Sequence, residues 1–362
     1  MQITSPTIIL DKKKCHHNIF LMAQKARAHN LIFRPHFKTH QSAIIGQWFR
    51  DFGVDKISVS SVEMAAYFVK NGWDDITIAF VFNILETQKL NDIAKIAKIN
   101  ILVDSIETIF YLDKHISENI GVFIKIDLGN KRTGVEYDSI VNISTLIDQL
   151  SKSKNLTFKG FIGHSGNSYK SKNKEEILSV HQNSLEKIKQ LRSIYISKYP
   201  DIIFSIGDTP TNTVADDFTN IDEIRPGNFV FNDVKQVNMG VCSYEDVAII
   251  VACPIVSKHS RRNEIIVYCG AIHLSKDFVI GKNGERLYGK VVFLNENGWT
   301  NPVDDVYVSE LYQEHGVIKA SHSFLFKAKI GDLIGIMPIH SCLTVSALKK
   351  YQTTDGDVIG TF

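Results

Sequence analysis

The chain has 362 residues, 44% of them hydrophobic, enough to bury a large core in one barrel with an appendage or in two ordinary domains. Its 41 Lys and Arg residues against 39 Asp and Glu leave a net charge of +2, and it has no long basic block interleaved with aromatic residues, which argues against nucleic acid as a partner. The five cysteines form no C-x-x-C pair, no basic-then-apolar leader begins the sequence, and no apolar run reaches ~18 residues, so we expect a cytoplasmic protein without a membrane partner.

From about residue 30 to residue 230, short apolar, β-branched runs alternate with longer segments that have the helix period. Two examples of the helical segments are 85–98 and 175–197, where apolar residues recur three and four apart among Lys, Glu and Gln. The predicted strands are 31–37, 54–60, 76–82, 99–104, 121–127, 158–163, 202–207 and 221–225. Eight strand–helix units of this kind predict an α/β fold, a (β/α)₈ barrel of the TIM type.

The first predicted strand runs into the sequence R-P-H-F-K-T-H at 34–40, which places Lys38 among one guanidinium and two imidazoles. Neighbouring cations and partial desolvation favour the neutral form of an amine, and a neutral amine is what a Schiff base with an aldehyde cofactor requires. Most lysines at strand ends are solvated surface charges, so the rest of the chain has to support this interpretation.

Polar residues also follow the other predicted strands. In a barrel the carboxyl ends of the strands share one face, where the active site lies, so we expect these side chains to converge. The alternative is that strands simply end in polar loops, which explains polarity but less well the recurrence of Lys, Asp, His and Arg. The strand-end residues are Lys38, Ser60, Asn83, Asp104, Asp127, His164, Asp208 and Arg225.

After about residue 233 the pattern changes to alternating β-type runs separated by turn sequences such as K-N-G at 282–284 and N-G at 297–298, which predict hairpins. We therefore expect two domains, a barrel at 11–235 and a C-terminal antiparallel β domain at 236–362, with residues 1–10 as a candidate extra strand of the second.

The β domain contains the pair His340-x-Cys342. If 337–344 begins as a strand, the period of two puts both side chains on one face, where an imidazole and a thiolate can bind zinc. Two protein ligands leave open positions for water and for a substrate's hydroxyl or carboxylate. The alternative interpretation of such a pair is core packing.

These features together resemble the D-serine dehydratase and D-threonine aldolase branch of the alanine-racemase-type enzymes, the fold type III enzymes of pyridoxal 5'-phosphate (PLP). The resemblance spans most of the chain, because the matching motifs recur in order. They are R-P-H-F-K-T-H at 34–40, D-L-G-N-K-R-T-G-V at 127–135, G-H-S-G-N-S-Y at 163–169, G-D-T-P-T at 207–211, R-P-G-N-F-V-F-N-D at 225–233 and H-S-C at 340–342.

The resemblance implies that PLP binds covalently to Lys38, with Arg132 near its pyridine ring and His164 and Tyr169 as catalytic groups on the substrate side, Tyr169 also contacting the cofactor. The phosphate is expected where the last two strands end, at Gly207, Thr209, Arg225, Gly227 and Asn228. Asp208 stands where relatives commonly have Gly or Ser. A carboxylate beside a phosphate is unfavourable, so we expect Asp208 to point away or the anchoring to be altered. His340 and Cys342 are implied to hold Zn²⁺, with another divalent ion as the alternative.

The activity implied is a lyase for D-configured β-hydroxy amino acids, first of all a D-serine dehydratase that forms pyruvate and ammonia. Among relatives a Cys at the position of Cys342 is associated with zinc-dependent dehydration, and a carboxylate there with aldolases and harder ions. The alternatives are a D-threonine or 3-hydroxy-D-amino acid aldolase, a barrel that binds PLP without turnover, and a racemase, for which no second base is identified. The resemblance also implies a homodimer.

Overall fold

The structure is a computed structural model that describes residues 3–362. The chain divides into two compact units. The barrel unit consists of Leu21–Lys38 and Gly46–Gly227, and the β unit consists of the residues up to Phe20 together with Thr39–Ile45 and Asn228–Phe362. No helix within the described range is long and apolar enough to cross a bilayer. The predicted domain boundary between 235 and 236 stays a prediction.

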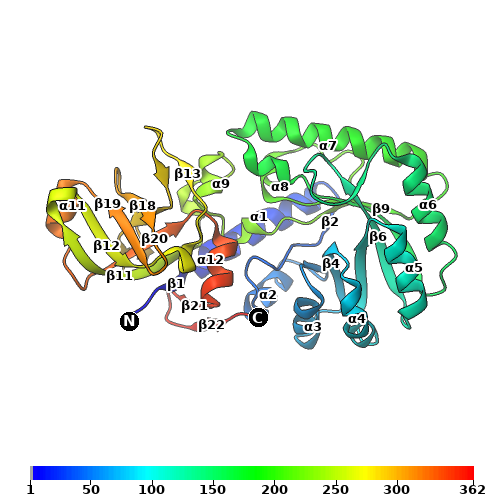
Figure 1. The fold of residues 1–362 in the computed structure, drawn as a ribbon, viewed down its shortest axis with the longest axis horizontal. Helices are drawn as coiled ribbons and strands as arrows, with labels where there is room; N and C mark the ends of the chain where they lie inside the picture. The colour runs from blue at the N-terminus through cyan, green and yellow to red at the C-terminus, as the bar shows by residue number, and fades with distance from the viewer. Residues whose placement is uncertain (1–2) are drawn as a thin grey trace. The chain divides into compact units, whose positions relative to one another are not determined.

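The barrel unit is built around eight parallel strands, which confirms the predicted fold class (Figure 1). Their order in the sheet is β2-β10-β9-β8-β6-β5-β4-β3, and a parallel bridge between His36 and Ser58 joins the first strand to the last. Each of these eight strands overlaps one of the predicted strands. The bounds are β2 (Ile32–Phe33), β3 (Ile57–Val59), β4 (Asp75–Val81), β5 (Lys98–Val103), β6 (Ile120–Asp127), β8 (Leu156–Gly163), β9 (Ile203–Ile206) and β10 (Glu223–Ile224). A short strand that was not predicted, β7 (Val135–Glu136), pairs with β6.

Helices alternate with these strands along the chain and lie outside them in Figure 1. Several begin at a residue whose side chain accepts a hydrogen bond from a backbone N–H of the first turn, such as Ser61, Ser105 and Asn173. The helices are α1 (Lys12–Ala28), which runs on from the other unit, α2 (Ala43–Arg50), α3 (Val62–Lys70), α4 (Thr87–Ala94), α5 (Ile106–His115), α6 (Ile140–Leu150), α7 (Lys174–Tyr195) and α8 (Thr209–Val214), with 3₁₀ turns η1 (Ile84–Glu86) and η2 (Gly166–Lys170).

The β unit contains a nine-stranded sheet in the order β12-β19-β18-β15-β20-β11-β1-β21-β22. All its pairings are antiparallel except one, because β1 pairs in parallel with β21. The bounds are β1 (Thr7–Leu10), β11 (Ile249–His259), β12 (Glu264–Tyr268), β15 (Gly289–Val292), β18 (Tyr307–Leu311), β19 (His315–Lys319), β20 (Leu333–Pro338), β21 (Lys350–Thr353) and β22 (Val358–Gly360).

Two short hairpins form at the predicted turns. One joins β13 (Val279–Ile280) to β14 (Arg286–Leu287), and the other joins β16 (Leu294–Asn295) to β17 (Gly298–Trp299). The helical elements of this unit are α9 (Val234–Asn238), α10 (Ala271–Leu274), α11 (His322–Lys327), α12 (Ser341–Leu348) and the 3₁₀ turns η3 (Asn228–Val230), η4 (Tyr244–Asp246) and η5 (Ser260–Arg262).

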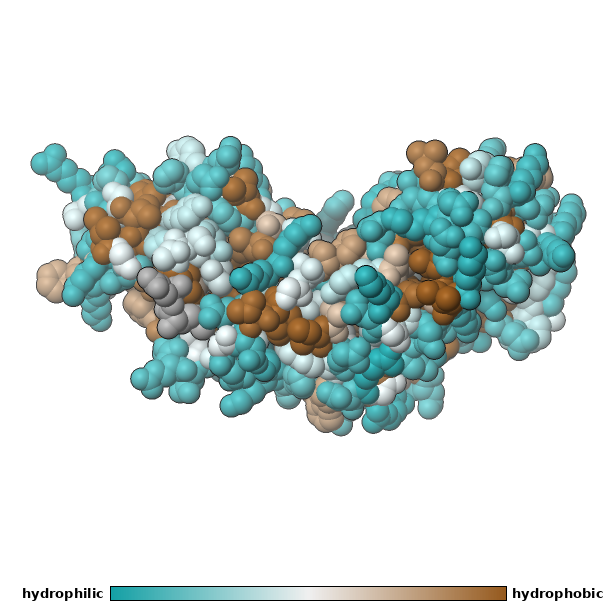
Figure 2. Space-filling model, turned by 90° about the horizontal axis from the view of Figure 1, so that it is seen from below, coloured by the Kyte–Doolittle hydropathy of each residue, from teal (hydrophilic) through white to brown (hydrophobic). Residues whose placement is uncertain are grey.

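Each unit has buried apolar side chains of its own. Leu102, Phe123 and Ile162, on neighbouring strands, pack together in the barrel unit, and the β unit has a larger cluster that includes Ile250 and Val292. Hydrophilic residues cover most of the face seen in Figure 2, with apolar side chains between them. The predicted site at Lys38 and the predicted site at His340 and Cys342 are therefore each supported by the core of their own unit.

Candidate active site

Lys38 is solvent-exposed at the end of the first barrel strand, although the residues before it are buried. Its neighbour Phe37 is fully buried against the rings of Phe49, Phe68 and Trp73, with ring centroids 4.9 to 5.1 Å away. The backbone N–H of Phe37 also donates to the carbonyl of Ser58 at 2.8 Å. The backbone at Lys38 is therefore fixed while its side chain reaches solvent.

His164 follows β8 and is held by the chain that follows β9. Its Nδ1 pairs with the carbonyl of Gly207. A carbonyl only accepts, so Nδ1 carries the hydrogen and Nε2 is the acceptor of the neutral ring. Burial lowers the pKa of His164 to about 3, with the charges of Lys38, Lys125 and Arg225 acting in the same direction. The structure thus brings Lys38 and His164 into one electrostatic environment with a neutral imidazole.

Arg225 is buried at the end of β10 and its guanidinium is fixed on two sides. Nη2 donates to the carbonyl of Gly163 at 2.6 Å, and Nε donates to Ser205 Oγ at 2.8 Å. A Cβ at Gly207 would lie 3.0 Å from Arg225 Nη1 and 3.1 Å from its Cζ. The glycine after β9 therefore leaves the room that the guanidinium occupies. Burial lowers the pKa of Arg225 to about 10, which still keeps it charged at neutral pH.

Asp208 is the N-cap of α8, and its carboxylate is turned into that helix. Oδ1 accepts from Thr211 N at 2.7 Å and from Ser168 Oγ at 3.0 Å, while Oδ2 accepts from Thr211 Oγ1 at 2.7 Å. Of the two outcomes expected for Asp208, the structure shows the first: the carboxylate points into its own helix and is hydrogen-bonded there. Burial raises its pKa to about 6.

Tyr169 and Thr209 meet beside this cap, because Thr209 N donates to Tyr169 Oη at 3.2 Å. Tyr169 lies on η2 and Thr209 is the first residue of α8. The predicted residues Tyr169, Gly207 and Thr209 are thus brought together, as their assignment to one cofactor pocket requires.

Arg132 lies exposed in the loop after β6, whereas Arg225 is buried. The sequence reasoning also missed Lys125, which lies on β6 with 7% exposure. Burial, aided by Arg225 and Arg132, lowers the pKa of Lys125 to about 7. The signal was present in the sequence as a single lysine between apolar residues in the strand at 121–126.

The β unit carries the second group of predicted residues. His340 Nδ1 and Asp277 Oδ2 are 2.7 Å apart, and the imidazole is also hydrogen-bonded to Cys342. Burial opposes the protonated ring, but the hydrogen bond and charge of Cys342, with the charges of Asp233 and Asp277, raise the pKa of His340 to about 9. Cys342 Sγ lies 3.2 Å from Thr39 Oγ1.

The expectation that a strand aligns His340 and Cys342 is wrong. Strand β20 ends at Pro338, His340 is the N-cap of α12, and Cys342 lies in its first turn. Proline ends the ladder because it lacks a backbone N–H, and a helix start then brings the two side chains together without the period of two.

The side chain of Asn228 contacts this second group, while its predicted phosphate role stays a prediction. Its Nδ2 donates to Asp233 Oδ2 at 2.7 Å and to Ser341 Oγ at 2.9 Å. Asp233 also accepts from the backbone N–H of Ser341 at 3.1 Å. Asn228 therefore braces the turn that carries His340 and Cys342, while Gly227 ends the barrel unit.

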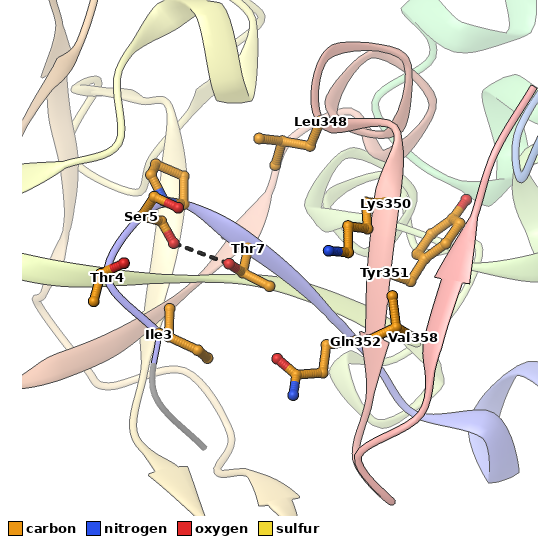
Figure 3. A pocket seen from close by; sticks show the side chains of 10 residues that line it. Ile3, Thr4, Ser5, Thr7, Leu348, Lys350, Tyr351, Gln352 and Val358 are labelled. Atoms are coloured by element: carbon orange, nitrogen blue, oxygen red, sulfur yellow. Dashed lines mark hydrogen bonds between the residues drawn. The ribbon is translucent and has the colours of Figure 1, made fainter.

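Among the residues that the structure describes, no group of three or more His, Cys, Asp or Glu side chains could hold a metal ion. Within that part of the chain, the predicted site supplies at most two ligands, His340 and Cys342. A separate pocket in the β unit, shown in Figure 3, is lined by residues of β1, β21 and β22 and the segments beside them. Lys350 is the charged residue of its lining, so that pocket lacks the acid–base groups of the predicted chemistry.

Comparison with known proteins identifies the family and the fold. Residues 10–234 match the family model described as the alanine racemase N-terminal domain, and residues 248–354 match the putative serine dehydratase domain. A D-serine dehydratase of Dictyostelium discoideum is 28% identical over 98% of this chain and 94% of its own. A D-threo-3-hydroxyaspartate dehydratase of Delftia sp. strain HT23 is 25% identical over 99% and 96%. The solved structure of the Delftia enzyme has a TM-score of 0.89 at 24% identity and covers 100% of this chain and 98% of that one.

Proposed function

Because this chain belongs to the family with the alanine racemase N-terminal domain, we propose that it is a PLP-dependent lyase that dehydrates D-serine to pyruvate and ammonia. The observation that carries the proposal is the exposed Lys38 on a rigid strand end, electrostatically coupled to the neutral His164. The full-length similarity to D-serine dehydratases supports it.

The barrel residues fit PLP chemically. An exposed amine at Lys38 suits the aldehyde, and Arg225, fixed and charged, suits the ring or the phosphate. The start of α8 is lined by Tyr169, Gly207 and Thr209. There the carboxylate of Asp208 points into the helix. When bound, PLP would supply the electron-withdrawing system that weakens bonds at the substrate's α-carbon.

In this proposal Lys38 Nζ takes the α-proton of the D-amino acid. Arg225 stays a cation and donates hydrogen bonds without giving up a proton. His164 remains neutral, with its hydrogen on Nδ1, so its Nε2 can accept a hydrogen bond but is a weak base. Tyr169 orients the start of α8 by accepting from Thr209 N.

We further propose that His340 Nε2 and Cys342 Sγ hold a zinc ion. An imidazole and a thiol are the donors that zinc prefers, and the Nδ1 contact with Asp277 orients the ring, a common support for metal-binding histidines. Zinc would act as a Lewis acid on the substrate's β-hydroxyl and ease its departure. The remaining positions of the ion would be open, because the chain offers two ligands.

The test is product analysis with purified protein, PLP and zinc chloride. Pyruvate and ammonia from D-serine support the proposal, and so would 2-oxobutyrate from D-threonine. Glycine and acetaldehyde from D-threonine would identify an aldolase, the runner-up, and no product from either would contradict both. A Lys38→Ala protein is the control, because it keeps the fold and loses the proposed base. We also propose a homodimer, which light scattering of the same sample tests.

A further inference from the structure

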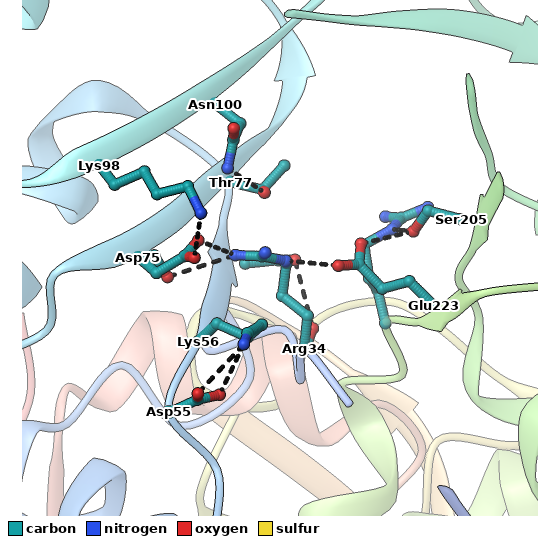
Figure 4. A network of polar contacts seen from close by, with 11 residues as sticks. Arg34, Asp55, Lys56, Asp75, Thr77, Lys98, Asn100, Ser205 and Glu223 are labelled. Atoms are coloured by element: carbon teal, nitrogen blue, oxygen red, sulfur yellow. Dashed lines mark hydrogen bonds and ion pairs between the residues drawn. The ribbon is translucent and has the colours of Figure 1, made fainter. Parts of the chain in front are cut away.

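Glu223 is a fully buried carboxylate that the proposed chemistry does not use. It lies at the start of β10 with 0% exposure. Its Oε2 accepts from Arg34 Nε at 2.7 Å and its Oε1 accepts from Ser205 Oγ at 2.7 Å (Figure 4). Each oxygen thus has its own donor, one directly after β2 and one on β9.

Ser205 links this carboxylate to Arg225. Arg225 Nε donates to Ser205 Oγ at 2.8 Å, and a hydroxyl has one hydrogen to give. A guanidinium only donates and a carboxylate only accepts, so the direction of the chain is fixed from Arg225 through Ser205 to Glu223. The Ser205 hydroxyl cannot reverse while Glu223 is charged. Ser205 is itself 0% exposed, so water cannot replace it.

On the other side of Arg34, this chain of hydrogen bonds continues to residues that reach solvent. Arg34 Nη1 donates to Asp75 Oδ1 at 2.7 Å, and Lys98 Nζ lies 3.1 Å from Asp75 Oδ2. The Asp75 side chain is 17% exposed and that of Lys98 is 65% exposed. Arg34 therefore has two carboxylate partners, one buried and one near the surface. Arg225 has no direct carboxylate bond in this network and connects to Glu223 only through Ser205.

We propose that Glu223 is a positioning residue that acts through Ser205 to fix the orientation of the Arg225 guanidinium toward the cofactor. The inference rests on the proposed function, in which Arg225 contacts PLP. Without the carboxylate, the Ser205 hydrogen would have no fixed acceptor and Arg225 Nε would lose its oriented partner. Arg225 Nη2 would still donate to the carbonyl of Gly163, so the guanidinium would stay in place but turn more freely.

Three variants of the PLP-loaded protein separate positioning from simple stability. Glu223→Gln removes the charge and keeps the shape, and Ser205→Ala removes the link while leaving the Arg34–Glu223 pair intact. Asp75→Asn is the matched control, because it removes the other carboxylate of Arg34 and does not touch Ser205. For each we would record the visible absorbance spectrum of bound PLP, kcat and KM with D-serine, and the midpoint of urea unfolding.

We expect Glu223→Gln and Ser205→Ala to shift the absorbance maximum of bound PLP and to lower kcat by about tenfold, comparable to the loss when the hydrogen-bond partner of a metal ligand is removed. Asp75→Asn should lower the unfolding midpoint and keep the wild-type spectrum and kcat. If Glu223→Gln does not fold, the absorbance spectrum and kcat of Ser205→Ala test the inference.

Wild-type spectra and kcat in a folded Ser205→Ala protein would overturn the inference while leaving the proposed function intact, provided that the wild type loads with PLP and forms pyruvate. An equal spectral shift in Asp75→Asn would also overturn it. A wild-type chain that takes up no PLP would refute the proposed function, and the role of Glu223 with it.

Discussion

At the scale of single residues, Asp208 combines the roles of helix cap and buried acid. Its carboxylate satisfies donors of Thr211 and Ser168, but it does so where burial raises its pKa to about 6. An acid whose folded pKa exceeds its unfolded value binds more protons in the folded state, so its ionisation lowers the free energy of unfolding as the pH rises.

We predict that Asp208→Asn flattens the pH dependence of stability in the cofactor-free protein. In the wild type the free energy of unfolding should fall by about 2 kcal/mol from this residue as the pH rises from 4 to 7. Asparagine remains a good N-cap and does not ionise, so the variant should lose that contribution. Urea unfolding at a series of pH values measures the difference. A variant with the wild-type slope between pH 4 and 7 would contradict the prediction.

At the second site we predict that His340→Ala or Cys342→Ala abolishes tight zinc binding. Zinc content after dialysis should fall from about one ion per chain to near zero, because a two-ligand site cannot lose a ligand and hold the ion. Elemental analysis gives this readout without reference to turnover. Cys242→Ala, a half-buried cysteine of the same unit, is the matched control and should keep the ion. Equal zinc content in Cys342→Ala and Cys242→Ala would refute the site.

At the scale of elements, β8 contains an irregularity that the sequence did not reveal. The register between β6 and β8 shifts beside Gly160, which has φ of +131°. A Cβ there would come within 2.1 Å of the carbonyl oxygen of Ile203 and 2.5 Å of its N. The strand can follow this path next to β9 only with glycine at that position.

Gly160→Ala should therefore lower the free energy of unfolding by about 3 kcal/mol or more, from backbone strain together with the clash. Gly72→Ala is the control, since Gly72 also has a positive φ, of +87°, but a Cβ there meets nothing within 4 Å. It should cost about 1 kcal/mol from backbone strain alone. Chemical denaturation of both variants compares them. Equal losses would mean that the clash at Gly160 is relieved by local movement.

The elements that the sequence predicted well are those with a strong hydrophobic pattern. The eight barrel strands were found because each is an apolar run bounded by a helix-period segment. Strands such as β21 and β22 in the β unit are short and partly polar, so their hydrophobic pattern is weak. The conformation of 337–344 was mispredicted because a helix begins three residues after Pro338, too close for a periodic signal.

At the scale of the whole molecule, the topology explains how residues far apart in sequence can be proposed for one site. Lys38, His164, Gly207 and Arg225 are far apart in sequence, but all follow strands of one parallel barrel. The sequence could predict that gathering from strand order alone. It could not predict which side chains turn inward, and so it overlooked the buried Lys125. The role of Arg132, which the family resemblance implies, stays a prediction.

Lys125 matters for the assignment of Lys38, because it is a second amine that, like Lys38, affects the pKa of His164, and its own pKa is about 7. The most direct test is to load the protein with PLP, reduce it with borohydride and map the modified lysine by peptide mass spectrometry. We predict that the modification lies on Lys38 and disappears in Lys38→Ala, with Lys125 unmodified. A cofactor found on Lys125, or on Lys38 and Lys125 equally, would contradict the assignment of Lys38 as the residue that binds it.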